Sequence, residues 1–450
     1  MVNTGDTAWI LTSAALVLLM TPGLALFYGG MVRAKSVLNM MMMSFGALAL
    51  ISVLWVLYGY SMAFGDDVGA GLLGNPGQFF GLKGLMEDTT SEAGGLPPMA
   101  FVGFQAVFAI ITVALISGAI ADRARFGAWM VFAGIWATLV YFPVAHWVFA
   151  FDGDDVVGGW IANDLAALDF AGGTAVHINA GAAGLALAFV LGKRRGFGRE
   201  AMRPHNLPLV MIGAGLLWFG WFGFNAGSAL AANNTASVAW VNTLVATGAA
   251  TLGWLLLEKI RDGHSTSLGA ASGVVAGLVA ITPACGAVTP LGALAVGAIA
   301  GAICPLAVAL KYRFGYDDSL DVVGVHLVGG VVGTLLVGFF GTAAAPSGRD
   351  GLFYGGGLEL LGVQATATVA VIGYGFVVSL LIAFAVDKTM GLRLSEESEA
   401  TGIDLDQHAE SAYDLEGVVH APGTKPTPQA VIASAERLVA SSATEGRPTP

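Results

Sequence analysis

Residues 169–191 read D-F-A-G-G-T-A-V-H-I-N-A-G-A-A-G-L-A-L-A-F-V-L, and the only ionisable side chain after Asp169 is His177. A helix needs about 20 predominantly apolar residues to cross the hydrocarbon core of a bilayer, and this stretch supplies them. A basic loop follows at once, with K-R-R at residues 193–195. The sequence therefore predicts a helix that crosses a membrane and ends in a basic loop.

The rest of the chain has the same character. Hydrophobic residues make up 56% of the 450 positions and charged residues 11%, whereas an ordinary soluble domain is about 25% charged. The 64 glycines would let membrane helices pack closely. Eleven segments are long and apolar enough to span a bilayer: 8–31, 37–64, 99–121, 127–150, 169–191, 206–230, 236–257, 267–284, 291–310, 321–342 and 358–385. We therefore predict an all-α integral membrane protein with eleven transmembrane helices.

The basic residues of the loops predict the orientation of these helices. Lys and Arg accumulate in cytoplasmic loops, and every odd-numbered span is followed by a basic pair or cluster. The intervening loops hold only Lys83 and Arg349, together with several acidic residues. We expect the N-terminus outside the cell, the C-terminus inside, and a multi-pass protein of the cell (plasma) membrane.

A short pattern occurs twice. The sequences H-I-N-A-G-A-A-G from His177 and H-L-V-G-G-V-V-G from His326 share H-x-x-[AG]-G-x-x-G, in spans five and ten. Because five is an odd number of spans, two halves of five would have opposite orientations, as in inverted-repeat transporters. We expect spans 1–5 and 6–10 to be inverted repeats, with span 11 added.

The composition divides the chain into three parts. Residues 1–386 form the predicted transmembrane domain. Residues 387–418 are polar and rich in glutamate and aspartate, which indicates a cytoplasmic segment. Residues 419–450 are dominated by Pro, Thr, Ser and Ala. They contain too little apolar surface to offset the entropy of ordering, so we predict a disordered tail.

The two repeated histidines are the leading candidates for function. Ionisable residues inside membrane spans usually face a protein interior or a substrate pathway. Each histidine is followed at i+4 and i+7, on the same helix face, by glycines that would allow the helices to approach: Gly181 and Gly184, then Gly330 and Gly333. A single such histidine would more often simply hydrogen-bond a neighbouring helix. Two in a repeated pattern favour a pathway.

Two aspartates begin the spans that carry the histidines. Asp169 precedes His177 and would lie toward the outer face, and Asp321 precedes His326 on the inner side. A carboxylate at a helix N-terminus can cap the exposed N–H groups, and at the outer face it could also attract a cation. For Asp169 both roles are compatible, whereas for Asp321 capping is the stronger interpretation.

Aromatic side chains gather in two spans, with a hydroxyl beside one group. Span three contains Phe101, Phe104 and Phe108, and span six contains Trp218, Phe219, Trp221, Phe222 and Phe224. Most membrane aromatics face lipid or the interface. Ser228 follows Phe224 by one helical turn, however, and aromatic faces with a hydroxyl can hold a small cation by cation–π attraction and hydrogen bonding.

The sequence offers little support for an enzyme. It lacks H-E-x-x-H, G-x-S-x-G and P-loop patterns, which would mark common hydrolytic and nucleotide-binding sites. Its two cysteines, Cys285 and Cys304, cannot form a disulfide framework or a four-ligand zinc site. We expect no catalytic activity, no cofactor, no metal and no nucleic-acid partner.

Four longer motifs resemble one family. D-F-A-G-G-T-A-V-H-I-N-A-G, W-F-G-F-N-A-G-S, T-P-A-C-G and D-V-V-G-V-H occur in this order and are similar to the ammonium transporter/Rhesus (Amt/Mep/Rh) family, in its bacterial Amt branch. The resemblance covers all eleven spans, and the stretch from G-L-R-L-S-E-E-S-E to H-A-E-S-A-Y-D resembles the cytoplasmic C-terminal region of the family. Only the C-terminal tail lacks a counterpart.

The resemblance implies roles for particular residues. Phe108, Phe149, Asp169, Trp221 and Ser228 would lie at or beside an outer ammonium-binding site, with Thr282 in the same outer region. Phe149 stands where many relatives place a tryptophan, so its cage offers a weaker cation partner without an N–H. Phe108 and Phe224 would form a phenyl gate with Phe104 one turn away, and His177 and His326 would line the pore.

The resemblance also implies an assembly and a mechanism. The family forms homotrimers with one pore per subunit. Ammonium would lose its proton near the gate, ammonia would cross along the histidines, and the imidazole pair would relay the proton, so that potassium is excluded. Residues 387–418 would be a regulatory segment that contacts a P-II-type signalling protein. The alternatives are an ammonium sensor that signals through its cytoplasmic segment and an ion-coupled transporter of a larger solute.

Overall fold

The computed structural model describes residues 2–86, 95–153 and 156–413. Within these ranges the chain forms helices, turns and isolated β-bridges, with no β-strand, which confirms the all-α prediction. Residues 2–410 belong to one compact unit. The predicted disordered tail, 419–450, and residues 414–418 of the predicted regulatory segment lie outside the described residues.

The helices have the following bounds. The α-helices are α1 Thr4–Met31, α2 Val37–Leu54, α3 Tyr60–Phe64, α4 Pro98–Ile116, α5 Phe126–Trp136, α6 Phe142–Phe149, α7 Asn179–Leu191, α8 Leu207–Gly227, α9 Asn234–Asp262, α10 Ser267–Ile281, α11 Pro290–Phe314, α12 Val328–Phe340, α13 Glu359–Met390, α14 Glu396–Thr401 and α15 Ile403–His408. Four π-helical turns are η2 Trp55–Gly59, η5 Ala137–Tyr141, η6 Gly173–Ile178 and η7 Val323–Leu327. Four 3₁₀ turns are η1 Ala34–Ser36, η3 Phe80–Leu82, η4 Ser117–Ile120 and η8 Leu352–Tyr354.

Ten helical segments of the described chain are long and apolar enough to cross a membrane, and each matches one of the predicted spans to within a few residues. The exception is the predicted span 267–284, where α10 has only 15 residues. Pro283 lies two positions beyond its last residue, Ile281, and proline can neither donate the next helical hydrogen bond nor fit against the preceding turn. The chain continues in turns to Ala287.

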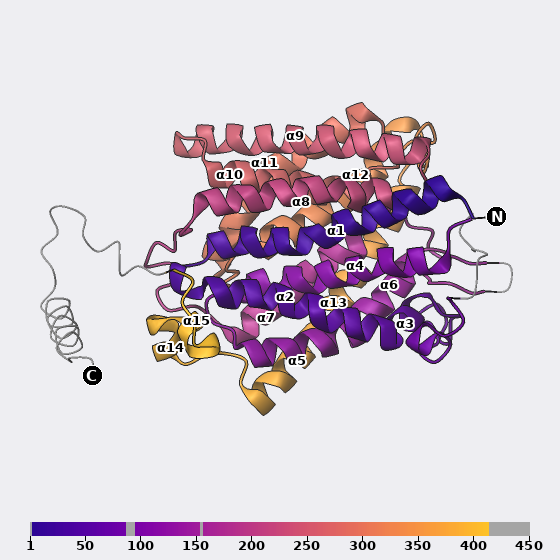
Figure 1. Ribbon diagram of the computed structural model, residues 1–450. Coiled ribbons are helices and arrows are strands. Elements are labelled where there is room, and N and C mark those ends of the chain that lie inside the picture. Colours follow the sequence, from indigo (N-terminus) through magenta and orange to yellow (C-terminus); the bar gives the residue numbers. More distant parts are fainter. Residues whose placement is uncertain (1, 87–94, 154–155, 414–450) are drawn as a thin grey trace, which may run out of the picture. The chain divides into compact units, whose positions relative to one another are not determined.

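Small residues allow the long helices to pack closely. Helices α1 and α8 run side by side along the bundle (Figure 1). A Cβ added at Gly213 would lie 2.3 Å from the backbone nitrogen of Phe27, and one added at Gly297 would lie 2.1 Å from the backbone oxygen of Ala246. Because no side chain fits at such distances, these glycines set how closely α1 approaches α8 and α9 approaches α11.

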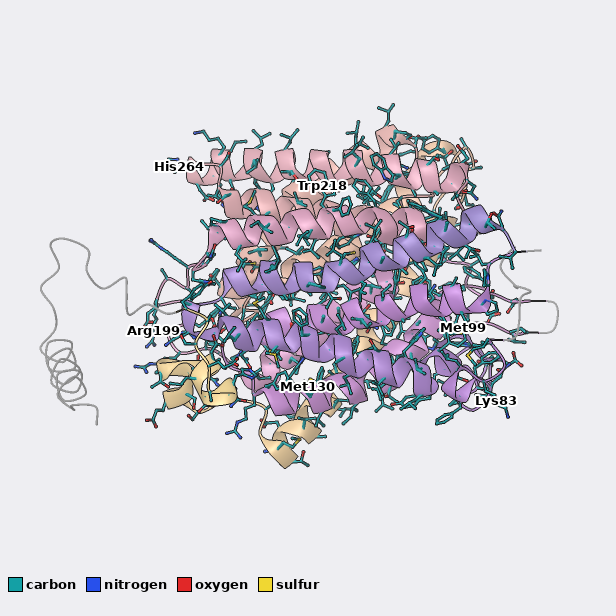
Figure 2. The ribbon with its side chains drawn as sticks, viewed as in Figure 1. Lys83, Met99, Met130, Arg199, Trp218 and His264 are labelled. Atoms are coloured by element: carbon teal, nitrogen blue, oxygen red, sulfur yellow. The ribbon has the colours of Figure 1, made fainter. Side chains whose placement is uncertain are left out.

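The loops gather at two ends of the helix bundle. Arg199 and His264 lie at one end, whereas Lys83 and Met99 lie at the opposite end (Figure 2). Helices α14 and α15 lie at the same end as Arg199 (Figure 1). The predicted basic loop after span five therefore shares an end with the C-terminal segment.

The C-terminal segment is fastened to this end by specific bonds. The Asp404 carboxylate accepts hydrogen bonds from the backbone N–H groups of Leu38 (3.0 Å) and Asn39 (2.8 Å), in the first turn of α2. Arg393 and Glu399 form an ion pair of 2.9 Å within the segment. A carboxylate is well suited to a helix N-terminus, where free N–H groups and the helix dipole favour negative charge. α15 thus caps α2.

Candidate functional site

The two repeated histidines meet inside the bundle. His177 lies on the π-helical turn η6 and His326 on η7, just before α7 and α12. The side chains are buried, with 1% and 3% exposed. Their Nδ1 atoms are 3.2 Å apart, and their rings stack with centroids 5.3 Å apart. In such a contact one ring donates the proton and the other accepts it, so the pair can hold a proton between the two helices.

Glycines allow the two helices to approach at this point. A Cβ added at Gly181 would lie 2.5 Å from the backbone nitrogen of Leu327, and one added at Gly330 would lie 2.9 Å from the side chain of Ile178. Each glycine therefore faces the turn that carries the other copy's histidine. The predicted close approach is confirmed.

Three buried phenyl rings form a series beside the histidines. The ring centroids of Phe104 and Phe108 are 4.9 Å apart, those of Phe108 and Phe224 are 4.2 Å apart, and those of Phe224 and His177 are 5.9 Å apart. All three phenylalanines are at least 98% buried. The rings that the sequence nominated as a gate therefore form a continuous series that ends at His177.

Trp221 lies beside both Phe224 and His177. Its indole stacks on His177 with centroids 5.3 Å apart and an interplanar angle of 18°, and it contacts Phe224 at 5.3 Å. Its Nε1 donates a hydrogen bond of 2.9 Å to Thr282 Oγ1. Trp221 and Thr282 thus belong to the inner part of the ring series.

A narrow cavity adjoins these rings. His177, His326, Trp221 and Phe224 line it, together with apolar side chains of α1, α4, α8 and α10. Its volume is about 10 Å³, close to the lower limit for a cavity that holds one water molecule. His177 Nε2 is buried and has no hydrogen-bond partner among the described residues. The cavity can hold a molecule the size of water or ammonia.

Asp169 organises the turn that leads to His177. The helix begins at Gly173, four residues after the predicted start of this span at Asp169. Gly172 has φ of 110°, a left-handed conformation that favours glycine, and the chain turns there. The Asp169 carboxylate accepts hydrogen bonds from the N–H groups of Gly172 (2.9 Å), Gly173 (2.5 Å) and Thr174 (2.8 Å) and from the Thr174 hydroxyl. The predicted capping role is confirmed.

Phe149 and Ser228, two residues nominated for the outer site, come from different elements. Phe149 is the last residue of α6 and is half-buried. A Cβ added at Gly172 would lie 3.3 Å from its ring, so the ring lies against the turn that Asp169 organises. Ser228 follows α8 and donates a hydrogen bond of 2.8 Å to the carbonyl oxygen of Phe224. Ser228 is therefore tied directly to the gate.

Comparisons with known proteins point to one family. The family model described as Ammonium Transporter Family matches residues 8–413. The chain belongs to this family. It is 62% identical over 432 residues to a protein of Mycobacterium tuberculosis named "Ammonium transporter", covering 91% of this chain and 90% of the relative.

Solved structures agree with this membership. The crystal structure of Candida albicans Mep2 superposes with a TM-score of 0.82 at 34% identity, covering 95% of this chain and 93% of that chain. A structure titled "Sensor Amt Protein" superposes with a TM-score of 0.82 at 28% identity and covers 90% of this chain and 98% of that one. The described part of the chain contains ten helices that are apolar and long enough to cross a membrane. This member of the Ammonium Transporter Family is therefore a multi-pass membrane protein.

The structure corrects the assignment of the second aspartate in this family member. The Asp318 carboxylate, rather than that of Asp321, accepts the N–H groups of Val322 (3.1 Å) and Val323 (2.7 Å) at the start of η7. Asp321 instead accepts a hydrogen bond of 2.5 Å from Lys311 Nζ. The sequence held a signal for this, because Asp318 precedes His326 by eight residues, the spacing of Asp169 and His177.

A network of buried charges lies around Asp318, near the start of η7. Burial raises the pKa of Asp318 to about 6, although the Lys311 charge opposes the shift. Burial also lowers the pKa of Arg123 to about 10, although the Asp317 charge opposes it. For Asp317, burial acts to raise the pKa, but the hydrogen bond from Arg194 and the Arg123 charge outweigh it and lower the pKa. The network is held by paired charges.

Metal coordination finds no support in the described chain. No group of three or more His, Cys, Asp or Glu side chains there could hold a metal ion. Cys285 and Cys304 are free and buried.

Proposed function

We propose that this protein is an ammonium transporter of the cell membrane. Ammonium is recruited at the outer face and loses its proton near the phenyl gate. Ammonia then crosses the narrow cavity while His177 and His326 relay the proton. The observation that carries this proposal is the pair of buried imidazoles 3.2 Å apart beside a cavity of about 10 Å³. The names of the relatives support the choice of ammonium as substrate.

The physical argument rests on the cost of burying an ion. A charged group moved from water into apolar surroundings without partners loses a large solvation energy. The gate of Phe108 and Phe224 offers no hydrogen bonds, and the cavity behind it is lined mostly by apolar side chains. Ammonia is neutral and small, so it crosses at much lower cost. Potassium has no proton to lose, so the same route excludes it.

The outer recruitment site is formed by Asp169, Phe149, Phe108 and Ser228, with Trp221 lying deeper. Asp169 supplies negative charge, although its oxygens also hold the helix start. Phe149 and Phe108 supply π faces that attract a cation, and Ser228 supplies a hydroxyl beside the gate. A cation held in this way has replaced part of its water shell before it loses its proton.

The proposed topology has eleven transmembrane helices, with the N-terminus outside and the C-terminus inside. α10 is the short eighth span, which the turns up to Ala287 extend. The shared end of the basic residue Arg199 and of α14 and α15 supports this orientation (Figures 1 and 2), because basic loops are cytoplasmic. The pairing of α1 with α8, and of η6 with η7, supports a five-plus-five inverted repeat. Native mass spectrometry tests the proposed homotrimer, which a monomeric mass would contradict.

The proposed domains are the transport domain 1–386, the regulatory segment 387–418 and the tail 419–450. The hydrogen bonds that Asp404 accepts at the start of α2 support a regulatory segment that is attached to the cytoplasmic end of the helix bundle. We propose that a P-II-type signalling protein binds there. A chain truncated after Met390 should lose this partner in a pull-down, and retention of the partner would contradict the proposal.

The transport proposal is tested with purified protein in proteoliposomes on a solid-supported membrane. An inward ammonium gradient should produce a transient current, methylammonium a smaller one, and potassium none above that of empty liposomes. An equal potassium current would contradict the deprotonation route. A folded protein without any ammonium current would favour the sensor function instead.

A further inference from the structure

The hydroxyl of Thr282 occupies a defined place beside the histidine pair. Thr282 directly follows α10 and is fully buried. Its Oγ1 donates a hydrogen bond of 2.7 Å to the carbonyl oxygen of Leu278 and accepts one of 2.9 Å from Trp221 Nε1. A hydroxyl has one proton to donate, and Leu278 fixes its direction. The free lone pairs of Oγ1 are therefore directed to the indole of Trp221.

Trp221 depends on this hydroxyl for its orientation. The indole has a single donor, its Nε1–H, and it is 99% buried. The centroid of the indole lies 5.3 Å from that of the His177 ring and 5.3 Å from that of the Phe224 ring. The cavity that it lines is otherwise largely apolar. A buried N–H that loses its partner is costly, so without the Thr282 hydroxyl the indole would gain by turning away.

We propose that Thr282 is a positioning residue for ammonium transport, which acts through the Trp221 indole to hold His177 and the Phe224 ring in register. This inference rests on the proposed transport function. A turned indole would no longer stack on His177, so the imidazole would lose one wall and the cavity would change shape. Because small displacements in a reacting site can cost a large factor in rate, the maximal flux should depend on this hydrogen bond.

The effect should fall on flux and not on recruitment. Trp221 contacts His177 and Phe224, whereas Phe149 and Asp169 lie at the turn before η6. Loss of the Thr282 hydroxyl should therefore lower the maximal ammonium current while the half-saturating ammonium concentration stays unchanged. A general loss of structure would instead lower the amount of folded protein and move both quantities.

Thr282→Val removes the hydroxyl at nearly constant volume, and Thr282→Ser keeps it. In proteoliposomes we expect Thr282→Val to lower the maximal ammonium current about tenfold at an unchanged half-saturating concentration, and Thr282→Ser to stay close to the wild type. In protein labelled with 5-fluorotryptophan, the ¹⁹F resonance that disappears in Trp221→Phe should shift in Thr282→Val and not in Thr282→Ser.

A double-mutant cycle shows whether Thr282 acts through the indole. Trp221→Phe has no N–H, so adding Thr282→Val to it should cause no further loss of current. The inference is overturned if Thr282→Val keeps the wild-type maximal current, if Thr282→Ser loses current as the valine variant does, or if the two losses multiply. The wild-type ammonium current in the same preparation tests the proposed function separately, because its absence would refute transport before any variant is compared.

Discussion

The two histidine-bearing halves of the molecule share a motif but differ in their charges. In each half an aspartate precedes the histidine by eight residues, the histidine lies on a π-helical turn, and an α-helix follows. Asp169 and Asp318 each accept backbone N–H groups at the start of that turn. The shared geometry places both histidines at equivalent points, so that they meet.

The difference lies around the two carboxylates. Asp318 is fully buried beside Lys311, whose Nζ donates to the Asp318 carbonyl oxygen (3.0 Å) and to Asp321. Asp169 is half-buried, and no salt bridge among the described residues involves it. The Asp169 carboxylate thus has no basic partner among the described residues, whereas Lys311 lies beside Asp318 and Asp321. We therefore propose that the two caps differ in purpose, and that a cation is recruited at Asp169 and not at Asp318.

The largest difference between the two halves should appear when Asp169 or Asp318 is replaced by a neutral residue. Asp169→Ala removes both the charge and the helix cap, so we expect loss of most ammonium current and about 1–2 kcal/mol of unfolding free energy. Asp169→Asn keeps an oxygen for the cap, so its stability should stay near the wild type while its half-saturating ammonium concentration rises. The matched variant Asp318→Asn should leave that concentration unchanged. Equal effects of Asp169→Asn and Asp318→Asn on half-saturation would remove the distinction between the halves.

The next effect concerns the selectivity of the histidine pair. His177→Asp would place a carboxylate in the cavity that stabilises a whole cation, so we expect a potassium current that the wild type lacks. His177→Asn is the control, because it is polar and carries no charge. Currents of both ions can be compared on the same proteoliposomes. A His177→Asp variant that still rejects potassium would show that the imidazole is not what excludes whole cations.

A third effect concerns the pH dependence of stability in the half that contains Asp318. The pKa of Asp318 is about 6 in the folded protein, against an ordinary value of 3.8. As the pH rises, the unfolded state therefore loses this proton at a lower pH than the folded state does. Below about pH 4 both states are protonated, and the folded state loses stability as the pH rises from about 4 to about 6, by about 2–3 kcal/mol. Asp318→Asn should remove this loss. Thermal unfolding in detergent from pH 4.5 to 7 measures this loss. If the unfolding temperatures of the wild type and of Asp318→Asn change with pH in the same way, the raised pKa of Asp318 is excluded.

The smallest effect concerns the cage beside Asp169. An indole has a better cation–π face than a phenyl ring, and at a partly exposed site the gain is about 0.5–1 kcal/mol. Phe149→Trp should therefore lower the half-saturating ammonium concentration about two- to fivefold. Phe149→Leu, which lacks a π face, should raise it. A half-saturation that is the same in all three proteins would place Phe149 outside the recruitment site.

The apolar pattern was sufficient to predict the spans, since apolar length alone decides whether a helix can cross a bilayer. It failed where backbone chemistry intervened. The stretch 267–284 is apolar throughout, but Pro283 ends the helix early. The π-helical turns that carry His177 and His326 have no periodic signature in the sequence, because they depend on how the two helices meet.

The sequence nominated the candidate site residues, but it did not predict the contacts between them. Motifs nominated His177, His326, Phe108 and Phe224, and the structure places them in one series of rings. The inner position of Trp221 depends on a partner 61 positions away in the sequence, which no local pattern reveals. The capping role of Asp318 could have been found from the repeated eight-residue spacing, because both copies contain it.

The central claim is that the imidazole pair relays the proton of ammonium. Leucine differs little in bulk from histidine but can neither accept nor donate a proton. The most direct measurement is therefore the ammonium-driven current of the His177→Leu/His326→Leu double variant in proteoliposomes, with its oligomeric state checked against the wild type. We predict that the current disappears while the assembly is retained. A wild-type current in this variant would contradict the relay and leave the histidines a structural role only.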